Sequence, residues 1–545
     1  MNPIQTNSNK SITVAIGFVI LLTQLSFASD NTNLIVQPQA TRLILLIVMD
    51  GLRPDSINAE DTPTLFRLRQ EGVTYLNSHS VFPTVTRVNA AAISTGMYPQ
   101  SNGLVSNAMF VPSVNPSRAF NTSDHRELLK LRDTSSGRML FARSMAERLH
   151  ERGMKFVAVS SGSTGSALLL NHRAPEGIGV LINGGFEPGR RVAYPDDVNA
   201  TVLSHFGAAP AEENSVAVDW ADHVLRDYVL KTLHPDVLID WQTEPDGSEH
   251  RTGSGSSETR KALANNDRNL ALTFEKLHEL GLDDKTDVII LSDHGFSRHD
   301  FRTNATRGLV QAGLKTSNDS NDVVLASNGQ SVLLHVAGHD RQRISKIVDF
   351  LKSQDWVESI FTAAAKSSSR RDAAKTSSDE LGWVPGTFSL ELIKEANAER
   401  GPDILFTLRW SSAANEFGIA GTHYTDGEGN PQALTGSASG HGGLSPWLVR
   451  NTLILWGPDF KKRATVRAAA GNVDIAPTIL SLKGVPVAES LDGRVLSEAM
   501  RGGPDEEQIL SETSILKTGS GAFQSAIQIT EVGRHRYIDK AWRIR

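Results

Sequence analysis

The 545-residue sequence contains no cysteine. This absence excludes disulfide-stapled scaffolds, cysteine-ligated zinc, iron–sulfur clusters, thiol nucleophiles and a lipid-modified N-terminal cysteine. Any metal site must therefore be built from histidine and carboxylate side chains.

The sequence also lacks a repeat period and a strong excess of either charge. Lys and Arg number 55 against 61 Asp and Glu, and the formal net charge is −6. This balance gives no electrostatic case for sequence-specific nucleic acid or an anionic membrane as partner. A small anionic substrate would need local positive charge, such as that of metal ions. With 39% hydrophobic residues, the composition is typical of a globular protein.

No hydrophobic run at the N-terminus is long enough to span a bilayer. Residues 1–28 carry one charge, Lys10, then an apolar stretch at 12–25 and a small-x-small sequence at 26–28. This pattern is typical of a cleavable signal peptide, whereas a membrane anchor needs about 20 apolar residues. We expect a periplasmic or secreted protein, with residues 29–41 as a linker and no stable membrane anchor after cleavage.

Apolar runs alternate with helical patterns along the rest of the chain. The runs lie at 43–49, 156–159, 237–241, 288–291 and 453–456, and the clearest helical patterns at 143–152, 258–280, 341–351 and 473–482. The alternation predicts an α/β fold with a doubly wound, mostly parallel central sheet flanked by helices. We assign this domain to residues 42–500, with a less regular inserted cap at about 300–440 that includes the polar stretch 367–380. Residues 501–545 are assigned to a C-terminal extension.

Carboxylates and histidines follow several predicted strands, at the edge where doubly wound sheets bind their ligands. Read singly, each Asp is also explained as a turn residue or helix cap, and a lone His as a hydrogen-bonded loop residue. Taken jointly, three Asp and three His form an oxygen and nitrogen ligand set that suits zinc and suffices for two metals. The six residues are Asp50, Asp246, His250, Asp293, His294 and His441.

Thr86 is the candidate nucleophile. Pro83 predicts an extended entry, and residues 87–94 have helix character, so Thr86 would stand at a helix N-terminus. The helix dipole and free backbone N–H groups there favour an alkoxide and a phosphate. Read alone, Thr86 is a helix cap; beside the candidate metal ligands, it is interpreted as a nucleophile.

In this order, the motifs resemble the alkaline phosphatase superfamily and, within it, the nucleotide pyrophosphatase/phosphodiesterase branch. Each motif alone is weak, but the ordered set is specific and covers most of residues 43–496. The matching segments are 48–55, 82–86, 95–99, 102–107, 244–250, 292–295, 439–442, 456–479 and 491–494.

The resemblance implies two zinc ions, although manganese or a mixed site fits the same ligand types. One zinc would be held by Asp50, Thr86, Asp293 and His294, and the other by Asp246, His250 and His441. Thr86 would attack phosphorus and form a phospho-threonine intermediate that water hydrolyses. Asn107 would donate a hydrogen bond to a non-bridging phosphate oxygen; on its own it is also explained as a turn residue. His79, His172 and His423 match no ligand motif and are interpreted as structural.

Two positions depart from the family pattern. Arg87 stands where the residue after the nucleophile is usually aromatic. Its guanidinium is suited to a second phosphate oxygen, as in a monoesterase, or to a distal phosphate or carboxylate of the substrate. Alternatively, Arg87 points into solvent as an ordinary helix residue. Glu249 stands where glycine often precedes the ligand histidine, which indicates a different local loop.

The sequence therefore predicts an exported, metal-dependent hydrolase of small phosphate esters, either phosphodiesters or nucleotide pyrophosphates. The alternative is a phosphomonoesterase or phosphonate hydrolase of the same superfamily, which Arg87 favours. A sulfatase is disfavoured because residues 86–88 do not fit a Cys/Ser-x-Pro-x-Arg motif. A metal-containing binding protein without turnover is disfavoured by the complete set of ligands, nucleophile and Asn107.

Overall fold

A computed structural model describes residues 43–210, 214–365, 379–427, 439–488 and 490–545. The predicted signal peptide (1–28), the linker (29–41) and nearly all of the polar stretch 367–380 lie outside the described residues. Among the helices that the structure describes, none has both the length and the apolar character needed to cross a membrane.

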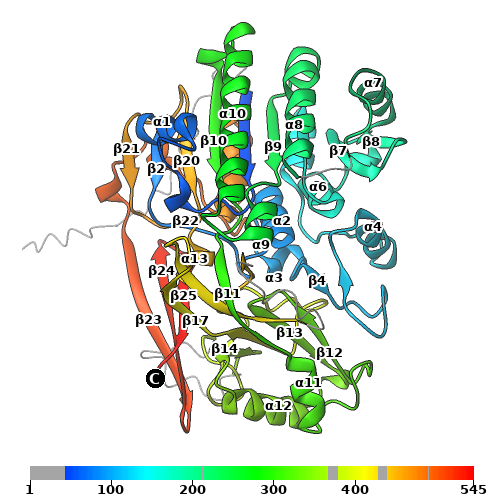
Figure 1. Ribbon diagram of the computed structural model, residues 1–545, viewed down its shortest axis with the longest axis vertical. Helices are drawn as coiled ribbons and strands as arrows, with labels where there is room; N and C mark the ends of the chain where they lie inside the picture. Colours follow the sequence, from blue (N-terminus) through cyan, green and yellow to red (C-terminus); the bar gives the residue numbers. More distant parts are fainter. Residues whose placement is uncertain (1–42, 211–213, 366–378, 428–438, 489) are drawn as a thin grey trace, which may run out of the picture. The chain divides into compact units, whose positions relative to one another are not determined.

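The central sheet has nine strands in the order β21-β2-β20-β10-β1-β9-β6-β7-β8 (Figure 1). Most neighbours are parallel; β20 runs antiparallel to β10 and β2, and β8 antiparallel to β7. The prediction of a mostly parallel sheet is therefore confirmed. The strands are β1 (Leu43–Met49), β2 (Val73–Tyr75), β6 (Phe156–Ser160), β7 (Val180–Glu187), β8 (Arg191–Tyr194), β9 (Val237–Gln242), β10 (Thr286–Leu291), β20 (Leu453–Trp456) and β21 (Ala464–Val466).

Helices cover both faces of this sheet because its strands are apolar on both sides. Ile44, Leu46 and Val48 of β1 pack into one core, and Leu45 and Ile47 pack into the other. Full burial of one such side chain contributes about 1.5–3 kcal/mol. The first core holds α2 (Thr86–Thr95), α4 (His125–Thr134), α5 (Met145–His150), α6 (Thr164–Leu170) and α14 (Ile475–Leu482). The second holds α1 (Pro63–Glu71), α7 (Asp196–Phe206), α8 (Asn214–Val224), a π-helix (Leu225–Leu233) and α10 (Ser257–Glu279).

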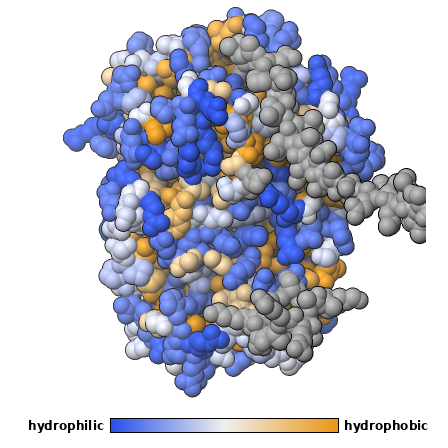
Figure 2. Space-filling view, turned by 180° about the vertical axis from the view of Figure 1, so that it is seen from behind, coloured by the Kyte–Doolittle hydropathy of each residue, from blue (hydrophilic) through white to orange (hydrophobic). Residues whose placement is uncertain are grey.

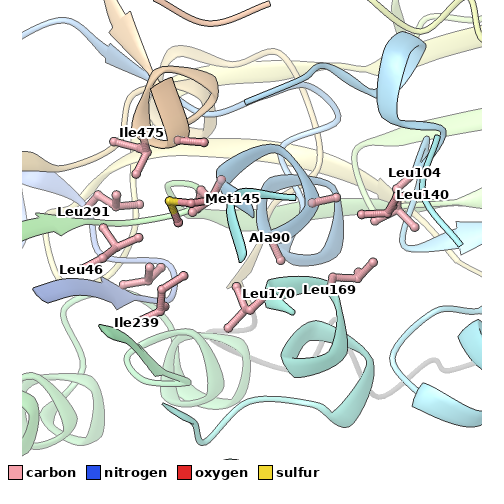
Figure 3. Packing of buried hydrophobic residues seen from close by; sticks show 14 of the residues in the cluster. Leu46, Ala90, Leu104, Leu140, Met145, Leu169, Leu170, Ile239, Leu291 and Ile475 are labelled. Atoms are coloured by element: carbon pink, nitrogen blue, oxygen red, sulfur yellow. The ribbon is translucent and has the colours of Figure 1, made fainter. Parts of the chain in front are cut away.

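Helix α2 packs in the first core together with side chains of the central sheet. Figure 3 shows Leu46, Ile239 and Leu291 of three strands grouped together, with Ala90 of α2 to one side of them and Leu170 of α6 beside Ala90. The small Ala90 and Ala91 side chains are buried, so neighbouring elements can pack closely against this face of the helix. This packing fixes the position of the helix N-terminus, where Thr86 lies.

The region at about 300–440 is more regular than predicted. It forms a five-stranded sheet, β12-β13-β16-β14-β15, and contributes to a four-stranded sheet, β17-β18-β11-β19. Two of these strands, β11 and β17, are largely half-buried or exposed, so they lack the continuous apolar runs of the central strands. The elements are β11 (Ser297–Thr303), α11 (Ala305–Gln311), β12 (Val323–Ser327), β13 (Ser331–Val336), α12 (Arg341–Ser353), β14 (Val357–Thr362), β15 (Phe388–Ser389), β16 (Ile404–Leu408), β17 (Trp410–Ala414), β18 (Ala420–Asp426) and β19 (Ser439–Gly440).

The C-terminal residues form an antiparallel sheet that packs on the rest of the chain. Its strands are β23 (Ser511–Ser520), β24 (Phe523–Val532) and β25 (His535–Arg543). The Ala541 N–H donates to the Leu444 carbonyl, and the Trp410 indole N–H donates to the Ala541 carbonyl. This sheet therefore contacts the segment that follows His441. The boundaries at residues 42, 500 and 501 remain predictions.

The remaining α-helices and strands are short. They are β3 (Ser78–His79), α3 (Pro99–Asn102), β4 (Ala108–Met109), β5 (Phe120–Asn121), α9 (Asp246–Thr252), α13 (Pro446–Val449) and β22 (Ala470–Gly471). Hydrophilic residues dominate the face in Figure 2, with smaller hydrophobic areas among them. The apolar side chains that form the cores lie inside the protein.

Candidate functional site

Three aspartates lie together at the carboxyl ends of three adjacent strands. Asp50 follows β1, Asp246 begins α9 just after β9, and Asp293 follows β10; these strands are neighbours in the order β10-β1-β9. The Gly51 N–H donates to Asp293 Oδ1 at 3.0 Å, and the Asp246 N–H donates to the Asp50 carbonyl at 3.0 Å. The loops that carry the aspartates are thus hydrogen-bonded to one another.

The first ligand group, called the buried group here, consists of Asp50, Asp293 and His294. All three residues are buried. His294 Nε2 lies 3.5 Å from Asp50 Oδ1 and 3.2 Å from Asp293 Oδ2. These ligand atoms face a common point, as one ion requires.

The second ligand group, called the outer group, consists of Asp246, His250 and His441. Asp246 Oδ1 lies 3.4 Å from His250 Nε2 and 3.5 Å from His441 Nε2. The segment that was expected to be a loop is the short helix α9. Asp246 and His250 lie one turn apart on one face of this helix. The His250 side chain is 43% exposed, which makes this group the more accessible of the two.

Glu249 occupies the same helix and is fully buried. Its two carboxylate oxygens have no hydrogen-bond partner within the described structure. Burial raises its pKa well above the usual range, although Arg53 nearby lowers it. The Glu249 side chain is therefore enclosed in the protein, and Asp246 and His250 still lie together.

The two groups lie next to each other. His294 Nε2 is 4.0 Å from Asp246 Oδ1. The rings of His294 and His441 are stacked, with centroids 3.7 Å apart and planes inclined by 16°. The two adjoining groups thus form a single site from residues at three strand ends and in the segment after β19.

Each histidine of the site presents the same ring nitrogen to it. The Nδ1 atoms of His250, His294 and His441 lie 3.0–3.1 Å from the backbone carbonyls of Ser439, Gly295 and Thr84, respectively. A carbonyl only accepts hydrogen bonds, so Nδ1 carries the proton and a neutral ring keeps its lone pair on Nε2. Metal-ligating histidines are oriented in this way.

The site contains acceptor atoms without donors. Asp50 Oδ1, Asp246 Oδ1 and Asp293 Oδ2 are buried and have no hydrogen-bond partner in the described structure. His250 Nε2 and His441 Nε2 face each other at 3.2 Å, where two lone pairs would repel. Such a cluster is stable only when protons or cations lie between the acceptors. The residues present therefore fit a metal centre.

The pKa values of the site residues also fit a metal centre. Burial, with the charges of Asp293 and Asp246, raises the pKa of Asp50 well above its usual range. Burial raises the pKa of Asp293 to about 7, and Asp246 adds to this effect. Burial lowers the pKa of His294 to about 3 and that of His441 well below its usual value. The two histidines are therefore neutral, as metal ligation requires, and the buried carboxylates need positive charge to ionise.

Thr86 is the first residue of α2, as predicted. Val85 before it is extended, and Thr86 is buried with its Oγ1 3.3 Å from His294 Nε2. Because His294 Nδ1 carries the proton, the Thr86 hydroxyl is the donor in this contact. The hydroxyl therefore lies beside the buried group and at the positive end of a helix dipole.

Asn107 and Arg87 complete the predicted set. Asn107 Oδ1 accepts a hydrogen bond from the Arg87 backbone N–H at 3.0 Å, so the Asn107 side chain reaches the N-terminus of α2. The Arg87 side chain does not extend freely into solvent: its Nε is enclosed and without a hydrogen-bond partner in the described structure. Burial lowers its pKa to about 10, while the carboxylates of Asp50, Asp246 and Asp293 raise it.

The structure adds two contacts that the sequence did not predict. The Trp241 indole N–H donates to Asp50 Oδ2 at 3.1 Å, and Asn328 Oδ1 accepts from the Asn107 N–H at 3.0 Å. Trp241 ends a predicted strand, but the strand pattern does not predict that its indole N–H binds Asp50. Asn328 precedes Gly329, and an Asn-Gly pair is common in hairpin turns. The pair therefore predicts a turn, but it does not predict the contact of that turn with Asn107.

The remaining histidines singled out in the sequence belong to neither ligand group. His79 pairs with Asp539 at 2.9 Å, His172 lies 3.8 Å from Glu147, and His423 Nδ1 lies 2.6 Å from Ser297 Oγ. Their contacts agree with the structural role assigned to them.

Comparison with known proteins yields one family and several relatives. The family described as type I phosphodiesterase / nucleotide pyrophosphatase matches residues 44–416. Ectonucleotide pyrophosphatase/phosphodiesterase family member 1 of Mus musculus is 26% identical over 257 residues, which cover 47% of this chain and 24% of that protein. Venom phosphodiesterase 2 of Crotalus adamanteus is 27% identical over 256 residues, covering 46% and 26%. The matches thus span about a quarter of these relatives.

The fold comparison covers more of the chain. Murine ectonucleotide pyrophosphatase/phosphodiesterase 5 superposes with a TM-score of 0.56 at 15% identity, covering 84% of this chain and 100% of that one. The α/β architecture is therefore shared well beyond the region matched in sequence.

Proposed function

Because the chain belongs to the type I phosphodiesterase / nucleotide pyrophosphatase family, we propose that it is an exported two-zinc phosphohydrolase. Its substrates are small phosphodiesters or nucleotide pyrophosphates, and the reaction proceeds through a phospho-threonine intermediate. The observation that carries the proposal is the Thr86 hydroxyl, 3.3 Å from His294 Nε2 at the start of α2 and beside two adjoining ligand groups.

Each ion has a proposed set of ligands. Asp50, Thr86, Asp293 and His294 would hold one zinc, and Asp246, His250 and His441 the other. When bound, two zinc ions stabilise the entering and leaving oxygens of an in-line displacement and lower the pKa of an oxygen nucleophile. The ligand types also fit manganese or a mixed site.

Thr86, Asn107 and the N-terminus of α2 have separate roles in the proposed reaction. Thr86 Oγ1 loses its proton to solvent and forms the new bond to phosphorus as the bond to the leaving oxygen breaks, and water later hydrolyses the phospho-threonine. Asn107 Oδ1 already accepts the Arg87 N–H, so its side-chain nitrogen is the atom free to donate to a non-bridging phosphate oxygen. The dipole of α2 favours the same negative charge.

The test combines metal content with turnover. The mature protein is assayed with bis-4-nitrophenyl phosphate, 4-nitrophenyl phosphate and NAD, and zinc is measured by mass spectrometry. We expect about two zinc ions per chain, and diester cleavage that falls about 10⁴-fold or more in Thr86→Ala. Thr95→Ala, at the other end of α2, is the matched control. If the zinc-loaded protein releases no 4-nitrophenol from either ester, the proposal is wrong.

A second candidate function, phosphomonoester or phosphonate hydrolysis, is favoured by Arg87. Its enclosed, unpartnered Nε lies where a guanidinium can bind a further oxyanion. If the protein is a monoesterase, Arg87→Ala lowers turnover of 4-nitrophenyl phosphate far more than turnover of the diester, and Arg87→Lys recovers part of the loss. An equal loss on both substrates would exclude this role.

Export is proposed from residues 1–28. The measurement is the N-terminal sequence of protein recovered outside the cytoplasm, which we expect to begin at Ser29. Recovery of the uncleaved chain in the cytoplasm would contradict this part of the proposal without affecting the chemistry.

A further inference from the structure

The turn between β12 and β13 reaches the candidate site from the inserted region. It consists of Asn328, Gly329 and Gln330, with the Asn328 N–H donating to the Ser331 carbonyl at 2.8 Å. Ser331 Oγ donates to the Gly442 carbonyl at 2.5 Å. A Cβ atom on Gly442 would lie 1.9 Å from the Asn328 carbonyl oxygen. The turn therefore packs directly on the backbone that follows His441.

The Asn328 side chain holds a second segment of the site. Its Oδ1 accepts hydrogen bonds from Ser106 Oγ at 2.9 Å and from the Asn107 N–H at 3.0 Å. Asn328 is only 7% exposed, and its Nδ2 is buried with no hydrogen-bond partner in the described structure. One side chain thus fixes the backbone of the residue proposed to contact phosphate.

We propose that Asn328 is a positioning residue for the phosphate-binding amide of Asn107. Asn107 is held at two points: its N–H by Asn328, and its Oδ1 by the backbone of Arg87. These two bonds orient the Asn107 side-chain nitrogen relative to Thr86. Because the Asn328 turn also packs behind His441, the inserted region sets the distance between the phosphate donor and the outer group.

This inference rests on the proposed function for its kinetic consequence, but the contact itself is testable without turnover. Hydrogen exchange at the Asn107 amide, resolved to single residues by mass spectrometry, reports the bond to Asn328. In Asn328→Ala we expect exchange at this amide to be about tenfold faster. Asn328→Asp keeps an acceptor oxygen in place and should retain protection. Asn321→Ala, an exposed asparagine of the same region, is the control and should leave this amide unchanged.

Kinetics then separate positioning from a general structural role. We expect Asn328→Ala to lower kcat for the diester by about 10- to 100-fold, as for other residues that orient a primary contact. Zinc content should stay near that of the wild type, and kcat is compared at a temperature where both proteins are fully folded, because Asn328→Ala also leaves the Ser106 hydroxyl and the Asn107 N–H without their acceptor. In an Asn107→Ala background, the same substitution should cost less than about threefold, because the group that it positions is already absent.

The experiments distinguish failure of the positioning role from failure of the proposed function. Unchanged exchange at Asn107 in Asn328→Ala, or a full additional loss of kcat in the Asn107→Ala background, would overturn the positioning role. A wild type that lacks turnover while the Asn107 amide still depends on Asn328 would overturn the proposed function and leave the contact standing.

Discussion

The buried and outer ligand groups use similar residue types in different surroundings. The buried group has two aspartates and one histidine, all inaccessible, and it contacts Thr86. The outer group has one aspartate and two histidines, and His250 is 43% exposed. On the proposed mechanism, the enclosed group serves attack by Thr86. The accessible group lies where water must enter to hydrolyse the intermediate. Accessibility, more than ligand chemistry, distinguishes the two halves of the site.

The largest difference is expected when one ligand is removed from each group. Asp293→Ala and His250→Ala should each lose about one zinc per chain. Asp293→Ala should also lower the free energy of unfolding, because the buried N–H groups of Gly51 and His294 lose their acceptor, at about 1–3 kcal/mol for each unpaired group. Compared after zinc removal from both proteins, His250→Ala should change the free energy of unfolding by less than about 1 kcal/mol. Urea denaturation with zinc analysis measures both; equal destabilisation would remove the distinction between the groups.

In the unmodified protein, the two groups should also release zinc to a chelator at different rates. We expect EDTA to release about half of the zinc in a fast phase from the outer group. The buried group should release the rest more slowly, since its ligands become accessible only through local opening. The zinc that remains on the protein is measured after rapid desalting at successive times. His250→Ala should lack the fast phase, and single-phase release from the wild type would contradict the comparison.

The smallest effect is expected from the hydrogen bond behind Asp50. Trp241→Phe removes the indole donor to Asp50 Oδ2 and should weaken zinc binding at the buried group by about 10- to 100-fold. The outer group should keep its affinity. Trp220→Phe is a matched control, because the Trp220 indole is buried without a hydrogen-bond partner in the described structure. Competition with a chelator of known affinity measures both variants.

The sequence predicted the central part of the site because its residues follow continuous apolar strands. Asp50 and Asp293 directly follow such runs, and a parallel sheet brings the ends of its strands to one edge. Helix α9 was not predicted, because its seven residues, six of them polar and one a glycine, carry no apolar periodicity. The inserted sheets were missed because strands such as β11 are only half-buried. The contact of Asn328 with Asn107 spans 221 positions, and no local pattern encodes such a pairing.

The contact of β25 with the segment after His441 bears on how the protein folds. The Ala541 N–H bonds to the Leu444 carbonyl, three residues beyond His441, whose own contacts lie with Thr84 and Asp246. Seven of the nine central strands precede His441 in the chain, whereas β25 is the last strand of all. The contacts of the outer group therefore close long loops, which is slow. We expect metal capture at this group to follow pairing of the strands that precede His441.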